Sequence, residues 1–228
     1  PLLMPVKLRL WDEGGKKILP NSQSLSEDGS WVVNFNQKKQ IVRIEGVDRE
    51  PIVSSFLGLS APVDHTDDLK GEESAILISC ETDPYVKYVK ARKCWFELLQ
   101  GSGNIQMPEY LLKAFDEVLS QWQDGPELVN IVFDLPSLQA CQESFMGYDF
   151  DVLVNSHKCL TKFIAIQWQE KWQEIYQESQ AILTSRSYDW NKSDINHRAI
   201  AKTALKMLVN ANYDQYAKIA ESLYHSSD

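Results

Sequence analysis

The hydrophobic period of the chain changes at Thr82-Asp83-Pro84, and this change constrains the fold more than any other feature. Before it, apolar residues alternate with polar ones or form short runs, as from Pro51 to Leu57, which is typical of β-strands. After it, apolar residues recur every three or four positions, the period of amphipathic helices. The sequence therefore predicts a β domain over residues 1–82, followed directly by an α-helical domain over residues 83–228.

The first domain has the short strands and turn signals of a β-sandwich. An alternating run from Val6 to Leu10 leads through Asp12-Glu13-Gly14-Gly15 into a second run from Lys16 to Leu19. Glycine pairs supply the positive φ angles of a hairpin turn, so these two runs are expected to pair. Because the domain is short and its first strand begins at Leu2-Leu3, we expect a partial Ig-like β-sandwich that lacks one or more N-terminal strands. Further strands are expected at residues 31–35, 40–44, 52–59 and 74–78.

The second domain opens with a strong helix start. Asp83 can accept amide protons as the N-cap, and Pro84 at the first helical position gives up no hydrogen bond. No glycine or proline interrupts residues 149–183, which are expected to form one long helix. Seven helices of unequal length and short connections predict an irregular α-superhelical array of the ARM/HEAT kind. The later helix starts are expected near Pro108, Gly125-Pro126, Leu135-Pro136-Ser137, Asp149, Asp194 and Asn212.

The chain is acidic in both predicted domains, with a formal net charge of −9. Residues 1–82 carry 9 basic and 13 acidic side chains, and residues 83–228 carry 14 and 19. Neither domain has the basic stripe that phosphate binding requires, so nucleic acid is not an expected partner. No apolar run approaches the roughly 20 residues of a membrane-spanning helix, and no signal segment opens the chain. No membrane contact is expected.

The cysteines lack the paired spacing of a metal site or redox motif. Four cysteines are sparse for a disulfide framework in a chain of this length, so free thiols and a cytoplasmic, reducing compartment are predicted. A disulfide framework is the extracellular alternative. The four residues are Cys80, Cys94, Cys141 and Cys159.

The sequence predicts no catalytic, metal or cofactor residue. The four histidines are scattered, and no catalytic motif for zinc, nucleotides or a nucleophilic serine occurs. His157 lies on the apolar side of the long helix, two positions before Cys159. Residues at i and i+2 point to different helix faces, so we interpret His157 as a histidine at the edge of the core rather than half of a Cys–His pair.

Two further groups are interpreted as structural. An acidic group lacks the alternating oxygen ligands of a calcium loop and is interpreted as a solvated loop. Three aromatic residues spaced by four are expected to pack against a partner helix. The acidic residues are Asp67, Asp68, Glu72 and Glu73; the aromatic residues are Trp168, Trp172 and Tyr176.

Several segments, in order along nearly the whole chain, carry a family resemblance. They are residues 6–19 with Leu10-Trp11-Asp12-Glu13-Gly14-Gly15, residues 51–63, Glu81-Thr82-Asp83-Pro84-Tyr85, Leu135-Pro136-Ser137 and residues 199–205. On these segments the chain resembles the C-terminal portion of bacterial-type aminopeptidase N, a zinc alanyl aminopeptidase of the gluzincin metallopeptidases. It departs at Lys87-Tyr88, where the family usually has Arg-Trp.

The resemblance implies a four-domain parent whose zinc and catalytic residues belong to earlier domains. No position of this chain matches those residues, so the fragment alone is expected to be inactive. Its expected role is that of a spacer and a helical lid that gates access of peptide substrates. Its expected partners are the missing N-terminal and catalytic domains of the parent chain. The family's helical domain is longer, so the array is expected to be cut short at Ser226-Ser227-Asp228.

Two other readings stay open. The first is a protein-interaction scaffold related to the family but without zinc. The second is an independent small enzyme that uses His157 or the acidic loop. Apolar surface left exposed would favour self-association in any of these cases.

Overall fold

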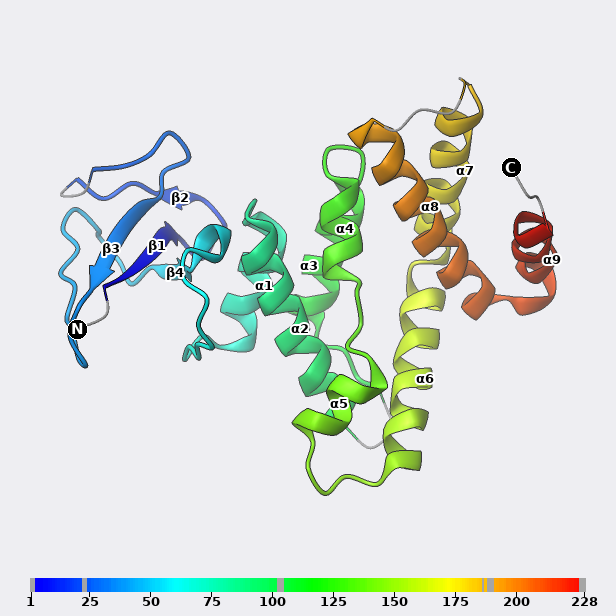
Figure 1. Ribbon diagram of the computed structural model, residues 1–228, viewed down its shortest axis with the longest axis horizontal. Coiled ribbons are helices and arrows are strands. Elements are labelled where there is room, and N and C mark those ends of the chain that lie inside the picture. Colours follow the sequence, from blue (N-terminus) through cyan, green and yellow to red (C-terminus); the bar gives the residue numbers. More distant parts are fainter. Residues whose placement is uncertain (1–2, 22–23, 102–104, 186, 188–190, 226–228) are drawn as a thin grey trace. The chain divides into compact units, whose positions relative to one another are not determined.

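A computed structural model describes residues 3–21, 24–101, 105–185, 187 and 191–225. In these residues a small antiparallel sheet precedes nine α-helices (Figure 1), which confirms the predicted order of β then α. The strands are β1 (Met4–Trp11), β2 (Lys17–Ile18), β3 (Trp31–Phe35) and β4 (Ile52–Ser55), and a 3₁₀ turn, η1, spans Leu57–Leu59. The helices are α1 (Gly71–Cys80), α2 (Pro84–Gln100), α3 (Glu109–Ser120), α4 (Pro126–Val132), α5 (Leu138–Ser144), α6 (Phe150–Gln167), α7 (Gln169–Thr184), α8 (Lys192–Ala211) and α9 (Tyr213–His225).

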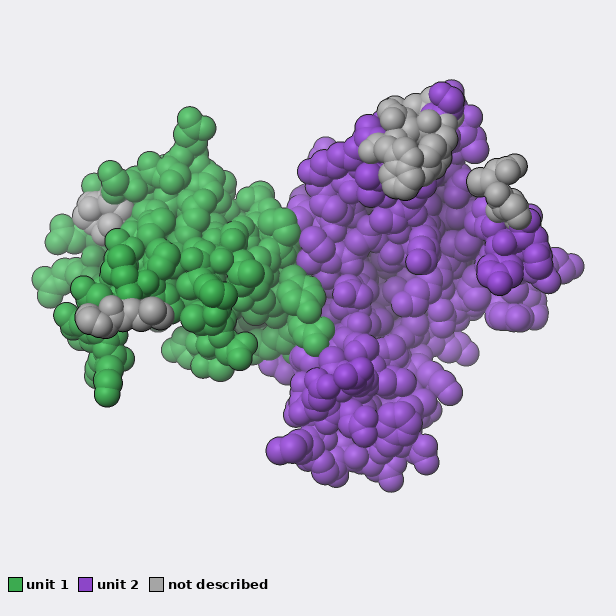
Figure 2. All heavy atoms as spheres, in the orientation of Figure 1, with its two compact units in different colours: residues 1–94, 108–118 green, residues 95–107, 119–228 purple. Residues whose placement is uncertain are grey.

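The chain divides into two compact units, coloured separately in Figure 2. The first holds residues 1–94 and 108–118, and the second holds residues 95–107 and 119–228. The predicted domain boundary at Thr82-Asp83-Pro84 lies within the first unit and stays a prediction. The predicted early end at Ser226-Ser227-Asp228 and the start of the first strand at Leu2 lie outside the described residues.

Strand β1 is the centre of the sheet. It pairs with β2 through Leu10 and Ile18, which confirms the predicted hairpin, and with β3 through Val6 and Val33. On its other side it pairs with β4, where Leu10 faces Val53. Side chains alternate along a strand, so Val6, Leu8, Leu10 and Trp31 form one buried cluster. Trp11 joins a second cluster with Ile52, Leu57, Leu77 and Val86.

The second cluster corrects the prediction of a strand at residues 74–78. These residues lie in α1, and Leu77 packs beside Trp11 of β1. A short apolar run has the same appearance in a buried strand and in a buried helix. In the described residues the strands form one sheet, and helices cover the face that carries Trp11.

The strand predicted at residues 40–44 is also wrong. The Gln40 side chain accepts a hydrogen bond from Asn36 N–H at 3.3 Å and donates one to Asn34 O at 3.1 Å. These contacts tie the segment to the end of β3 through a side chain rather than a backbone ladder. Ile41, which lies in the predicted strand, is 87% exposed.

The long helix predicted at residues 149–183 is two helices, α6 and α7. The break lies at Trp168, whose φ of −118° and ψ of 31° depart from helical values. Trp168 is buried, and the Trp172 indole donates a hydrogen bond to Ile164 O at 3.3 Å across the break. The break therefore comes from packing of large aromatic side chains, which no proline or glycine announces in the sequence.

In the second unit, helix α8 packs against α4, α6, α7 and α9. The predicted helix starts at Leu135-Pro136-Ser137 and Asp149 are confirmed by their caps. Ser137 Oγ accepts from Ala140 N–H at 3.2 Å, and Asp149 Oδ1 accepts from Asp151 N–H at 2.8 Å. None of the helices in the described residues has the length and apolar character needed to cross a membrane.

Candidate functional site

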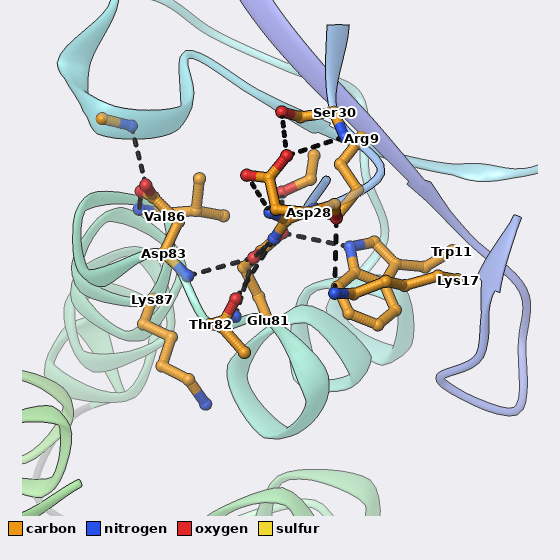
Figure 3. Close-up of polar contacts among 12 residues, drawn as sticks. Arg9, Trp11, Lys17, Asp28, Ser30, Glu81, Thr82, Asp83, Val86 and Lys87 are labelled. Carbon is orange, nitrogen blue, oxygen red and sulfur yellow. Dashed lines mark hydrogen bonds and ion pairs between the residues drawn. The ribbon is translucent and has the colours of Figure 1, made fainter. Parts of the chain in front are cut away.

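A group of buried polar side chains surrounds Glu81, which directly follows α1 (Figure 3). Arg9 reaches it from β1 and Ser54 from β4, and Asp28, from the segment before β3, pairs with Arg9. Strand alternation explains the meeting: Arg9 and Trp11 share one face of β1, opposite Leu8 and Leu10. We call Arg9, Trp11, Asp28, Ser54 and Glu81 the Glu81 joint.

The Glu81 carboxylate accepts hydrogen bonds on both oxygens. Oε1 forms an ion pair with Arg9 and accepts from the N–H groups of Thr82 at 2.7 Å and Asp83 at 3.0 Å. Oε2 accepts from Trp11 Nε1 at 3.0 Å and from Ser54 Oγ at 2.5 Å. The side chain of Glu81 is fully buried and that of Arg9 is 3% exposed. A buried charge is tolerated only when paired and hydrogen-bonded in this way.

Asp28 holds the other end of the Arg9 guanidinium. Its Oδ2 lies 2.7 Å from Arg9 Nη2 and 3.3 Å from Lys7 Nζ. Its Oδ1 accepts from Ser30 Oγ at 2.5 Å. The Ser30 hydroxyl is the main cause that holds the pKa of Asp28 well below its usual range, with Lys7 and Arg9 adding to it against a smaller opposing effect of burial. Arg9 therefore bridges two carboxylates, one fully buried and one partly exposed.

Asp83 caps α2, as the sequence predicts. Its Oδ1 accepts from Val86 N–H at 3.1 Å, and its Oδ2 accepts from Gly58 N–H at 2.7 Å. One carboxylate thus fixes both the start of α2 and the η1 turn that follows β4. The hydrophobic period of the sequence changes at Asp83, and the same residue attaches α2 to the η1 turn after β4.

Lys87 links α2 to the end of α1. Its Nζ donates to Ile78 O and, at 3.1 Å, to Ser79 O. These carbonyls lie in the last turn of α1, where a donor satisfies groups that the helix leaves open. Burial lowers the pKa of Lys87 to about 8. Lys87 therefore supplies a helix-to-helix contact at the position where the resembled family has arginine.

The Glu81 joint is suited to holding elements together rather than to proton transfer. Every donor that reaches Glu81 comes from the protein, and five hydrogen bonds occupy its two oxygens. A general acid or base needs a substrate within hydrogen-bond reach. The joint was not predicted from the sequence, because a charged residue between two apolar ones, such as Arg9 between Leu8 and Leu10, is also the pattern of a strand with one exposed face.

His157 is half-buried at the edge of the core. Its Nε2 lies 3.1 Å from Pro136 O, and burial lowers its pKa. Cys141 Sγ also lies near Pro136 O, at 3.8 Å. The four cysteines are free thiols. His197 lies edge-on to Trp122, with ring centroids 6.2 Å apart.

The acidic loop is not simply solvated, which corrects its interpretation for Asp67 and Glu73. Asp67 pairs with Lys90, whose side chain is 2% exposed, and lies 3.5 Å from Lys93 Nζ. Glu73 belongs to α1 and accepts from Lys70 N–H at 2.7 Å. The group thus divides into one anchored aspartate and the acidic first turn of a helix.

Trp168 and Trp172 are core residues, as predicted. Both are buried, and their rings meet Phe133 edge-on with centroids 5.6 and 5.0 Å away. Tyr176 is half-buried and lines a groove between α7, α8 and α9. The aromatic run therefore begins in the core and ends at the surface.

The described residues do not fit the zinc that the resemblance implies for the parent. No group of three or more histidine, cysteine, aspartate or glutamate side chains among them could hold a metal ion. A zinc site takes three or four such ligands around one ion. No chemical step is derived through zinc.

Two comparisons with known proteins agree with this architecture. Residues 71–228 match the family described as "Domain of unknown function (DUF3458_C) ARM repeats". The fold is similar to a solved structure of aminopeptidase A from Legionella pneumophila in complex with aspartic acid, with a TM-score of 0.78 and 17% sequence identity. That likeness covers 95% of this chain and 25% of the aminopeptidase, so the chain spans about a quarter of its length. Because the family match covers more than half of the sequence, the chain belongs to the DUF3458_C ARM-repeat family.

Proposed function

We propose that this chain is a non-catalytic part of an aminopeptidase-like protein. The sheet acts as a spacer, and the helices act as a lid over the cleft that receives peptides. The observation that carries the proposal is the similarity of fold to a quarter of an aminopeptidase, together with the match to an ARM-repeat family. The zinc and catalytic groups belong, in this proposal, to another part of the same protein.

The Glu81 joint supports the role of spacer. A spacer must hold the first helices at a fixed place on the sheet. Arg9, Trp11 and Ser54 from two strands converge on the residue that ends α1, and Asp83 ties α2 to η1. Buried polar groups that hydrogen-bond to one another favour a single arrangement of the elements that carry them. Sheet, α1 and the first turns of α2 therefore behave as one body.

An activity assay tests the claim that the chain is not catalytic. The purified chain is incubated with alanine 4-nitroanilide, with and without added zinc, beside a zinc aminopeptidase as positive control. We expect no release of nitroaniline above the buffer rate, because the described residues hold no ligand set for zinc. Release that a chelator abolishes would contradict the proposal.

A second candidate function is a protein-interaction scaffold. The exposed apolar residues of the α5–α6 connection, Met146 and Phe150 among them, favour this candidate. The sequence encoded upstream of this chain in the same reading frame distinguishes the aminopeptidase-like protein from the scaffold. A His-Glu-x-x-His motif upstream supports the aminopeptidase-like protein, and its absence supports the scaffold.

A further inference from the structure

The connection between α5 and α6 and the first residues of α6 together display a cluster of large apolar side chains. Met146 is 91% exposed and Phe150 is 50% exposed, with Tyr148 and Val152 also exposed. Methionine and aromatic residues are enriched in the cores of protein interfaces. We call residues 145–152 the aromatic loop.

The aromatic loop is held in a fixed shape. Phe145 is buried and contacts Phe96 edge-on, with ring centroids 5.4 Å apart, and its ring lies 5.5 Å from that of Tyr148. Asp149 caps α6 through the N–H groups of Asp151 and Val152 at 2.8 and 3.3 Å. A surface ordered in advance loses less conformational entropy on binding.

The aromatic loop is also acidic. Asp149 and Asp151 alternate with its apolar residues and carry its only charges. A negative surface repels nucleic acid and anionic membranes. The chemistry of the loop therefore fits a protein surface that is apolar and carries positive charge.

Such a surface exists on the same unit, in the groove between α7, α8 and α9. The groove has a volume of about 360 Å³, which is within the range of pockets that receive ligand-sized groups. Leu183, Leu205 and Leu223 supply apolar walls, with Tyr176 and Tyr224 beside them. The two charged residues of its lining, Arg198 and Lys202, are both basic.

We propose that copies of this chain associate head to tail, with the aromatic loop of one copy in the α7–α9 groove of the next. Apolar groups meet apolar walls, and Asp149 and Asp151 approach the exposed Lys202. The two surfaces belong to different helices of one unit, so the contact is heterologous and each copy can use both surfaces at once. This inference is independent of the proposed function, because it rests only on surface chemistry of the second unit.

Sedimentation velocity of the full chain from about 1 to about 200 μM tests the proposal, a range that covers weak protein association. We expect the weight-average sedimentation coefficient to rise with concentration. Phe150→Ser removes an exposed apolar group of the loop, and Lys202→Glu reverses the charge of an exposed groove residue. Each variant alone is expected to associate at least roughly tenfold more weakly. Lys38→Glu, an exposed charge reversal in the first unit, is the matched control and is expected to behave like the wild type.

The decisive sample is an equimolar mixture of the two variants. Lys202→Glu keeps an intact loop and Phe150→Ser keeps an intact groove, so the mixture retains one productive contact. We expect a 1:1 dimer that does not grow further, while each variant alone stays monomeric. Circular dichroism and thermal melting confirm that both variants are folded. A wild type that stays monomeric over the whole range, or a mixture that forms no dimer, overturns the proposal.

Discussion

Glu81 carries a carboxylate that is surrounded by hydrogen-bond donors. Its carboxylate is fully buried, and strands, backbone amides and the Arg9 guanidinium supply its hydrogen bonds. Removing one member of such a group leaves the others buried without a partner. The energetic importance of the joint therefore lies in the dependence of its members on one another rather than in any single contact.

We expect Glu81→Ala to lower the free energy of unfolding by about 3 to 5 kcal/mol, the range for breaking a buried ion pair. The loss arises mainly from the unpaired Arg9 guanidinium. Urea unfolding monitored by tryptophan fluorescence measures it, with the exposed Glu50→Gln as the control.

The double variant Arg9→Met/Glu81→Leu completes this test. It replaces both charges with apolar groups, so we expect it to recover much of the stability lost by Glu81→Ala. A double variant as unstable as the single one would show that the ion pair does not explain the effect.

The lowered pKa of Lys87 predicts that the free energy of unfolding rises at alkaline pH. Burial lowers its pKa from 10.5 to about 8 in the folded chain, so between these values the unfolded chain binds more protons and stability increases with pH. We expect the unfolding free energy of wild type minus that of Lys87→Met to grow by about 2 kcal/mol between pH 7.5 and 10. Subtracting the variant removes the opposing effect of Cys80, whose pKa burial raises from 9.0 to about 12.

Lys87→Arg is the matched control for this pH dependence. Arginine stays charged over the whole range, so this variant should lack the alkaline rise. If the difference between wild type and Lys87→Met is flat with pH, the lysine is charged in the folded chain and the explanation is wrong.

At the scale of elements, the turn of the β1–β2 hairpin packs closely on the end of α1. Gly15 has a φ of +74°, and a Cβ atom placed there would lie 3.2 Å from the Cβ of Cys80. Glycine is therefore required at position 15 for two reasons: the backbone has a positive φ angle, and the turn approaches Cys80 closely. Gly58 has a φ of +64° but faces open space.

A comparison of Gly15 with Gly58 separates the energetic cost of backbone strain from that of steric crowding. We expect Gly58→Ala to destabilise the chain by about 1 kcal/mol, the cost of a left-handed alanine. Gly15→Ala should cost roughly 1 kcal/mol more, because it also forces the hairpin away from α1. Thermal unfolding of both variants measures the difference. Equal effects would mean that the turn adjusts freely.

Helix starts that carry a capping side chain could be predicted from the sequence, whereas the packing of apolar segments far apart in the chain could not. Asp83, Ser137 and Asp149 act through neighbouring amides, so local sequence is sufficient to predict them. Residues 74–78 form a helix because Trp11 and its neighbours cover them, which local sequence does not reveal. Trp168, at the break between α6 and α7, packs against Phe133, which lies far away in the chain, so local sequence does not reveal this contact either.

At the scale of the whole molecule, the order of β then α and an array of helices with short connections could be predicted from the hydrophobic period and the helix-start signals, but no repeat period in the sequence marks the ARM repeats. The Glu81 joint could not be predicted. Arg9 and Glu81 lie 72 positions apart within the predicted β domain, and nothing in the sequence indicates that their charges pair. Contacts of this kind depend on three-dimensional neighbours, so only coordinates reveal them.

The Glu81 joint also has a consequence for the order of folding. Arg9 and Glu81 are 72 positions apart, so their contact must wait for a long loop to close, whereas helical hairpins such as α8 and α9 make local contacts. During synthesis, Arg9 of β1 leaves the ribosome well before Glu81, the residue that pairs with its charge. We expect backbone amides of β1 to gain protection from hydrogen exchange later than those of α8. Until then Arg9 remains in water, and its charge helps to keep the early chain from aggregating.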